Sequence, residues 1–173
     1  YLVRAAGQGH RDREAAERFA QAAVTAGVRK IVYLSGPEVA AASAGPGGCC
    51  EIGRILRESG VPTLEFRASI IIGSGSLSFE LVRGLVEGSP LMAAPRWVYS
   101  LAQPIAIEDV IAYLLEALAV ELEQSQIVEI GGLNQMGYSE IMHEYARQRG
   151  LRRLIVSVPV YAPKLSCWWL RLP

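Results

Sequence analysis

Two histidines and a pair of adjacent cysteines are the side chains of this sequence best suited to acid/base or thiol chemistry. His10 stands beside an arginine and an aspartate, where it could approach a phosphate, and a solvated polar loop explains it equally well. His143 lies near Glu140 and Glu144, but these spacings differ from the HExxH pattern of zinc enzymes. The sequence therefore predicts no metal site.

The cysteines allow two interpretations. Cys49 and Cys50 open a helical pattern, where the helix dipole favours a reactive thiolate, but no basic partner is fixed nearby and buried structural thiols are the simpler alternative. With Cys167 far away, the three cysteines do not form a disulfide framework. We therefore expect a reducing compartment, the cytoplasm. The N-terminus also lacks the pattern of a signal peptide.

Ser35 is the hydroxyl best placed for a catalytic role, because it follows the apolar run 31–34. A serine at such a strand end also commonly forms a turn. Arg67 lies within a second apolar run, where it could contact a carboxylate or phosphate or anchor backbone carbonyls. Asp109 is better placed to cap a helix than to abstract a proton. The remaining aromatic candidates could line a substrate pocket or pack in the core: Trp97, Tyr99, Trp168 and Trp169.

Short strands and helices alternate through the first part of the chain. A strand at 1–3 precedes a helix that begins near Asp12 and ends at Gly27, and a strand at 31–34 follows. After a Gly/Pro/Ala-rich loop at 36–48, a second helix ends at Gly60 and leads into an extended run to Gly73. Strands and helices in this order predict an α/β fold with a parallel sheet, in which ligands bind at the carboxyl ends of the strands.

The second part alternates less regularly. Ser76 or Ser78 is expected to cap a helix, and the carboxylates at 108–109 open an apolar helix that runs to Leu118. A strand at 126–130, a helix from Ser139 to Gly150 and a strand at 154–158 complete the prediction.

Composition excludes several classes of function. Seventeen basic and seventeen acidic residues cancel, so no basic surface indicates a nucleic-acid partner. The most apolar long stretch, 110–120, contains Glu116 and is too short to cross a bilayer, so we expect no transmembrane segment. With 173 residues and 51% apolar content, the chain has the size and composition of one globular domain. These properties favour a small-molecule ligand or a protein partner.

Five segments, 26–35, 56–63, 66–73, 104–110 and 128–132, together resemble the atypical, extended short-chain dehydrogenases/reductases of the NmrA-like, NAD-dependent epimerase-like kind. The resemblance implies a Rossmann-like doubly wound parallel sheet that binds NAD or NADP, and an oxidoreductase or epimerase acting on an unidentified substrate. It further implies that residues 1–3 form the fourth strand. The first three strand-helix units would then be absent, together with the glycine turn that binds the pyrophosphate. We expect a single domain fragment over 1–173, with substrate-side segments at about 76–103 and 133–173.

By the same resemblance, the nicotinamide side of the cofactor would lie against three strand ends. The implied cofactor-binding residues are Ala5, Ala6, Leu34, Ser35, Ala68, Ser69 and Ile70. Small side chains suit these positions, because a dinucleotide lying across strand ends needs the backbone close to it.

The resemblance fails at the catalytic pair. Active members of the family use a tyrosine and a lysine four residues apart, and the family spacing places Gly45 and Cys49 at those positions. Ser35 is then the only remaining member of the catalytic group. A non-catalytic protein that senses a dinucleotide, or an accessory protein of an assembly, is therefore the alternative to an enzyme. A homo-oligomer or a partner protein could join through the exposed edge of strand 1–3 or through the apolar tail 164–172.

Overall fold

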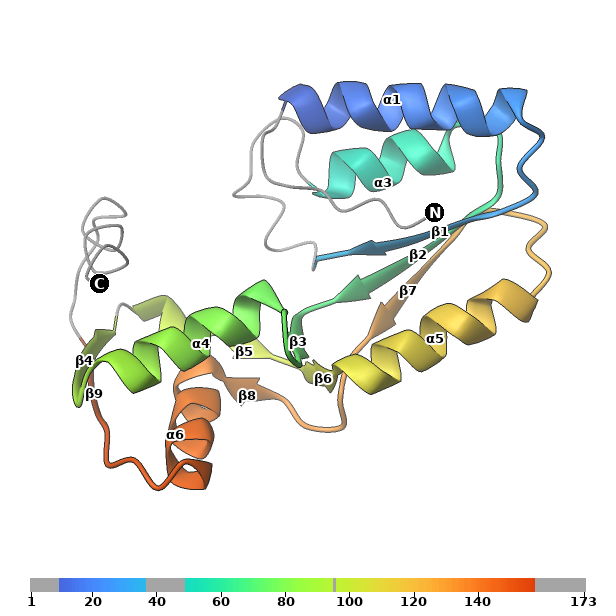
Figure 1. Ribbon diagram of the computed structural model, residues 1–173. Helices are drawn as coiled ribbons and strands as arrows, with labels where there is room; N and C mark the ends of the chain where they lie inside the picture. The colour runs from blue at the N-terminus through green and yellow to red at the C-terminus, as the bar shows by residue number, and fades with distance from the viewer. Residues whose placement is uncertain (1–9, 37–48, 95, 158–173) are drawn as a thin grey trace. The chain divides into compact units, whose positions relative to one another are not determined.

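The computed structural model describes residues 10–36, 49–94 and 96–157, and its elements divide into two compact units (Figure 1). The first unit comprises the chain up to Ser69 together with Ile105–Gly131, and the second comprises Ile70–Pro104 and the chain from Gly132. Strand β6 (Pro104–Ala106) lies where the chain returns to the first unit. Each unit is therefore built from two separate stretches of sequence.

The first unit is a parallel sheet with helices on both faces. Its strands β1 (Ile31–Ser35), β2 (Thr63–Ala68) and β7 (Gln126–Ile130) pair in the order β1-β2-β7, all parallel. Helices α1 (His10–Thr25) and α3 (Cys49–Arg57) lie over one face, and α5 (Ile107–Ala119) lies over the other (Figure 1). This architecture confirms the predicted Rossmann-like α/β fold.

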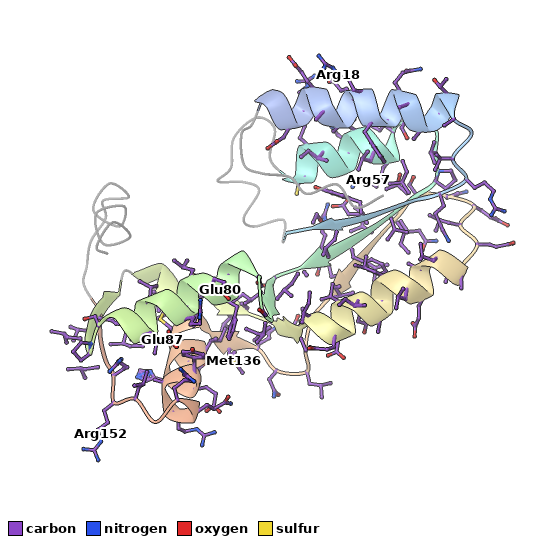
Figure 2. The ribbon with its side chains drawn as sticks, in the orientation of Figure 1. Arg18, Arg57, Glu80, Glu87, Met136 and Arg152 are labelled. Carbon is purple, nitrogen blue, oxygen red and sulfur yellow. The ribbon has the colours of Figure 1, made fainter. Side chains whose placement is uncertain are left out.

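Apolar residues at helical spacing attach α1 and α3 to the sheet. Ala16, Ala20 and Ala23 of α1 are buried with Ile52 and Leu56 of α3 against β1. Figure 2 shows Arg18 on the side of α1 that is turned away from the sheet, where its side chain is 84% exposed. The amphipathic pattern of the sequence is thus sufficient to orient these helices.

Glycines end the helices where the sequence predicted. Gly27 has φ +63°, and the Val28 N–H donates to the Ala23 carbonyl at 3.0 Å, which closes the C-terminus of α1. Gly150 has φ +66° and ends the helix at 138–148 in the same way. Both backbones are in the left-handed region, which glycine adopts without steric cost.

Lys30 ties the start of β1 to the end of α5. Its Nζ donates to the carbonyl oxygens of Ala117 at 2.6 Å, Leu118 at 3.1 Å and Val120 at 2.6 Å. The last carbonyls of a helix have no partner within the helix, and a cation also suits the negative end of its dipole. One ammonium group therefore satisfies three acceptors at once.

Replacing Lys30 with methionine is expected to lower the free energy of unfolding by about 1–2 kcal/mol, because partly exposed charged hydrogen bonds are lost while the aliphatic stem is kept. Hydrogen exchange should accelerate in the last turn of α5. Arg29→Met, at the exposed neighbouring position, is the control and should change stability by less than about 0.5 kcal/mol. Equal losses in both variants would contradict the role assigned to the Lys30 contacts.

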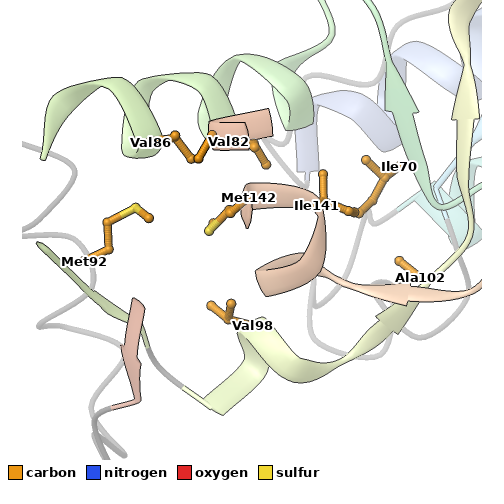
Figure 3. Close-up of a cluster of buried hydrophobic side chains, with 9 residues drawn as sticks. Ile70, Val82, Val86, Met92, Val98, Ala102, Ile141 and Met142 are labelled. Atoms are coloured by element: carbon orange, nitrogen blue, oxygen red, sulfur yellow. The ribbon is translucent and has the colours of Figure 1, made fainter. Parts of the chain in front are cut away.

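The second unit has a mixed architecture around its own core. Its elements are β3 (Ile70–Ile72), α4 (Leu77–Gly88), β4 (Leu91–Ala94), the 3-10 turn η1 (Arg96–Tyr99), β5 (Leu101–Ala102), β8 (Met136–Gly137), α6 (Tyr138–Gln148) and β9 (Leu154–Ser157). Strands β4 and β9 pair in parallel, and β5 and β8 pair antiparallel. The buried side chains of Ile70, Val82, Val86, Ile141 and Met142 bring β3, α4 and α6 together (Figure 3).

Two local expectations differ from the structure. The extended run to Gly73 is not one strand: β2 ends at Ala68 and β3 begins at Ile70, because the chain leaves the first unit after Ser69. Ser76 does precede α4, but its hydroxyl makes no cap hydrogen bond and donates instead to the Ile71 carbonyl at 2.6 Å. The serine therefore joins the start of α4 to β3.

Candidate functional site

The carboxyl ends of the three parallel strands of the first unit lie together. Ser35, the last residue of β1, is opposite Arg67 of β2, and Ala68, the last residue of β2, is opposite Ile130, the last residue of β7. In open α/β sheets ligands bind beyond this edge. We therefore take this edge as the candidate site.

The structure brings some of the sequence-predicted cofactor residues to this edge and not others. Leu34 and Ser35 end β1, Ala68 ends β2, and Ser69 follows it. Ile70 belongs to the second unit, where its fully buried side chain packs in the core. Ala5 and Ala6 lie outside the described residues.

The two positions predicted to replace the catalytic pair are only partly described. Gly45 lies outside the described residues, and Cys49 is the first residue of α3. The half-buried Cys50 follows it. Ser35 is the one member of the predicted catalytic group whose side chain is described, and it is 7% exposed.

A buried ionic network lies directly beneath the strand ends. Thr63, Glu65 and Arg67 alternate along β2 and share the side of the sheet on which α3 packs. Glu65 is completely buried, yet its Oε1 accepts hydrogen bonds from Ser35 Oγ at 2.9 Å and from Arg67 Nε at 3.0 Å. Its Oε2 forms an ion pair with Arg57 of α3, the helix on which Figure 2 labels this arginine. One carboxylate therefore lies between two guanidinium groups.

The environment of the network explains its electrostatics. Burial lowers the pKa of Arg57 from its ordinary value, and the neighbouring charge of Arg67 lowers it further. Gly53 of α3 leaves room for the carboxylate, because a Cβ on Gly53 would lie within 2.8 Å of Glu65 Oε1. Glu65 is thus in direct contact with both arginines and packs closely against Gly53.

Sequence reasoning identified Arg67 but missed Glu65. Arg67 Nε donates to the Glu65 carboxylate of the same strand, a contact within the protein, and the ligand contact considered for Arg67 stays a prediction. The available signal was the alternation of Thr63, Glu65 and Arg67 with apolar residues, which places all three on one face of a strand. Because β2 is the central strand of the described sheet, that face is covered by a helix and the charges are buried.

The second unit has a hollow of about 370 Å³ along α6, lined by Tyr99, Ser139, Glu140, His143, Glu144, Arg147 and Ile155. His143 is exposed, and its Nδ1 lies 3.1 Å from the Ser139 carbonyl. Glu140 Oε2 accepts the Gly137 N–H at 2.7 Å and so caps the helix. His143, Glu144 and Arg147 thus make hydrogen bonds within α6, and Glu140 caps its N-terminus. Within the described residues, no group of histidine, cysteine, aspartate and glutamate side chains could hold a metal ion.

Glu144 makes the folded protein sensitive to acid. Hydrogen bonds from Arg147 and Gln148 lower the pKa of Glu144 from 4.5 to about 2. A carboxyl group whose pKa is lowered by folding stabilises the fold above its ordinary pKa, and that contribution is lost as the pH falls from about 4.5 through 2. Glu144→Gln should therefore flatten the pH dependence of the urea midpoint between pH 5 and pH 2. The exposed Glu121→Gln is the control, and an equal effect there would contradict this assignment.

A search for membrane spans among the described residues finds no helix that is both long and apolar enough to cross a bilayer.

Comparison with known proteins identifies the fold. No protein-family model matches the sequence, and no curated protein matches it either. Solved structures do match: MoeE5 in complex with UDP-glucose and NAD has a TM-score of 0.67 at 20% identity, over 86% of this chain and 57% of that chain. The dTDP-4-dehydrorhamnose reductase of Bacillus anthracis in complex with NADP has a TM-score of 0.67 at 14% identity, over 88% and 62%. DesIV, a dTDP-glucose 4,6-dehydratase of Streptomyces venezuelae with NAD bound, has a TM-score of 0.63 at 17% identity, over 84% and 53%.

These matches support the Rossmann-like fold and leave the finer assignment open to proposal. The chain spans between 53% and 62% of the length of these three solved structures. The matched regions cover most of both units described above.

Proposed function

We propose that this chain is the nicotinamide-side part of an NAD(P)-binding protein of the atypical, NmrA-like short-chain dehydrogenase/reductase kind. The observation that carries the proposal is the alignment of Ser35, Ala68 and Ile130 at one edge of a parallel sheet. The similar solved structures, which contain NAD or NADP, support it. The single-domain assignment over 1–173, with substrate-side segments at about 76–103 and 133–173, and the cofactor roles of Ala5, Ala6 and Ile70 belong to the same proposal.

Within this proposal, the protein binds the dinucleotide without the standard chemistry of the family. Gly45 and Cys49 cannot replace a tyrosine and a lysine, and the Ser35 hydroxyl is engaged by Glu65. We expect hydride transfer to carbonyl substrates to be slow or undetectable. The cysteine pattern favours a reducing compartment, and we place the protein in the cytoplasm.

The test is a titration of the full-length protein with NADH and NADPH, followed by the fluorescence of the reduced nicotinamide. Saturable binding that excess NAD or NADP displaces would support the proposal. Turnover is then measured with ketone and quinone substrates. Absence of saturable binding would overturn dinucleotide binding, and rapid reduction that is lost in Ser35→Ala would overturn the non-catalytic assignment.

An accessory role in an assembly is a second candidate, and an apolar groove along the edge of β1 that pairs with no described strand favours it. The groove has a volume of about 510 Å³ and is lined by Phe19, Ala22, Ala23, Ala26, Val28, Lys30, Ile31, Val32, Ile111, Leu114, Leu115 and Leu118. On α5, Ile111, Leu115 and Leu118 are 48%, 62% and 66% exposed, which is unusual for side chains at helix-packing spacing. Such a surface suits further strand-helix structure or a partner protein. Self-association detected by light scattering would support an interface at this groove, whereas the titration above decides dinucleotide binding separately.

A further inference from the structure

The Ser35 hydroxyl can donate one hydrogen bond, and two acceptors lie near its oxygen. Ser35 Oγ lies 2.9 Å from Glu65 Oε1 and 3.4 Å from the Phe66 carbonyl. The shorter contact, to a carboxylate, is the stronger of the two. Ser35 therefore donates to Glu65 and keeps only its lone pairs for other contacts.

Glu65 is held in the state that accepts this hydrogen. An ionised carboxylate is an acceptor at both oxygens, whereas a protonated one also donates. The guanidinium groups of Arg57 and Arg67 both contact Glu65, and opposite charges favour the ionised form. The two arginines thus fix the direction of the Ser35 hydrogen bond through their contacts with Glu65.

Stability alone does not explain a buried network of this kind. Burying charges is costly, and apolar replacements of buried ion pairs are often at least as stable. Within the network, Arg67 is one residue before the end of β2 and pairs with Ser35, the last residue of β1. We propose that Glu65 is a positioning residue that makes Ser35 a hydrogen-bond acceptor for the carboxamide N–H group of a bound nicotinamide.

This inference rests on the proposed function and makes it more specific. A carboxamide N–H is a donor and matches the free lone pairs of Ser35. The oxygen of a carbonyl substrate needs a donor, and Ser35 has already given its hydrogen to Glu65. The same arrangement therefore favours the cofactor as the partner of Ser35 and disfavours polarisation of a substrate carbonyl.

The experiment compares NADH with the reduced 3-acetylpyridine adenine dinucleotide, in which a methyl ketone replaces the carboxamide and removes its N–H donors. The full-length wild-type protein should bind NADH about five- to tenfold more tightly, the usual effect of one hydrogen bond. Ser35→Ala should weaken NADH binding to the level of the acetyl analogue and leave the analogue unchanged. The ratio of the two dissociation constants is the readout, because a general loss of stability would change both ligands equally.

Glu65→Gln gives the second arm. The amide keeps the size of the side chain but can donate to Ser35, which frees the serine hydrogen, and the preference for NADH should then disappear or reverse. Ser125→Ala is the control for a purely structural serine: Ser125 Oγ accepts from the Thr63 N–H at 3.1 Å and donates to the Arg57 carbonyl at 3.3 Å. It should lower the melting temperature without changing the ratio. If Glu65→Gln does not fold, the wild type and Ser35→Ala still decide whether Ser35 accepts from the carboxamide, and loss of that contact would overturn the role assigned to Glu65 as well.

The outcomes separate the two proposals. If neither dinucleotide binds saturably, dinucleotide binding fails and this inference fails with it. If wild type binds both equally, or if Ser35→Ala keeps the preference, dinucleotide binding stands and the role assigned to Glu65 and Ser35 is wrong.

Discussion

Replacing Glu65 with leucine is expected to lower the free energy of unfolding by about 3–5 kcal/mol, the largest single effect we predict for this protein. The carboxylate is completely buried and contacts both Arg57 and Arg67. Without the carboxylate, the two largely buried guanidinium groups would lie close together with no negative charge to offset their repulsion. Denaturation by urea, followed by circular dichroism, measures the loss.

Glu58→Leu is the matched control for this prediction. Glu58 also pairs with an arginine, Arg54, at 2.6 Å, but its side chain is 61% exposed. Exposed pairs contribute little, and this variant should change stability by less than about 1 kcal/mol. Replacing Arg57 and Arg67 by methionine together with Glu65→Leu should recover much of the loss, because an apolar group would then replace the whole network. A triple variant no more stable than Glu65→Leu would argue against electrostatics as the cause.

The second prediction concerns Gly53, where an alanine should destabilise the protein by about 1–3 kcal/mol although alanine is the better helix former. A Cβ at this position of α3 would lie 2.7 Å from the Cδ of Glu65, too close for any unstrained contact. The carboxylate would have to move away from its partners. Thermal and urea denaturation of Gly53→Ala should both report the loss.

Gly84→Ala is the control, because the same substitution should raise the stability there instead of lowering it. Gly84 lies inside α4, and a Cβ there would meet nothing within 4 Å. The added methyl group should raise stability by roughly 0.5–1 kcal/mol, the usual helix preference for alanine over glycine. If both variants shift stability in the same direction, the steric argument at Gly53 is wrong.

Local patterns were sufficient to predict the first unit. The apolar run before Ser35 and the glycines at 27 and 60 mark elements that depend on contacts close in sequence, and the strand predicted at 126–130 is found at those residues. The break at Ser69 could not be predicted in this way. Residues 63–72 are uniformly suitable for a strand, and only the division of the chain into two units ends β2 before Ile70.

The candidate site was predictable only in outline. The resemblance to the dehydrogenase/reductase family named Leu34, Ser35 and Ala68 as strand-end residues, and the structure places them at the ends of β1 and β2. The role of Glu65 depends on contacts with residues of two other elements. Gly53 and Arg57 belong to α3, and Ser35 belongs to β1. A glutamate at an alternating position usually faces water, and nothing local distinguishes one that is enclosed by a helix.

The interleaved sequence of the two units also bears on how the protein is made. Among the described strands of the first unit, β7 is translated only after the chain has entered and left the second unit. At ordinary rates of synthesis, β2 waits on the order of several seconds at the ribosome for β7, its partner strand. Segment 70–104 likewise waits for α6 and β9. Nascent-chain arrest before and after Gly131 should therefore show protease resistance of the sheet only in the longer chain, and chaperone binding mainly in the shorter one.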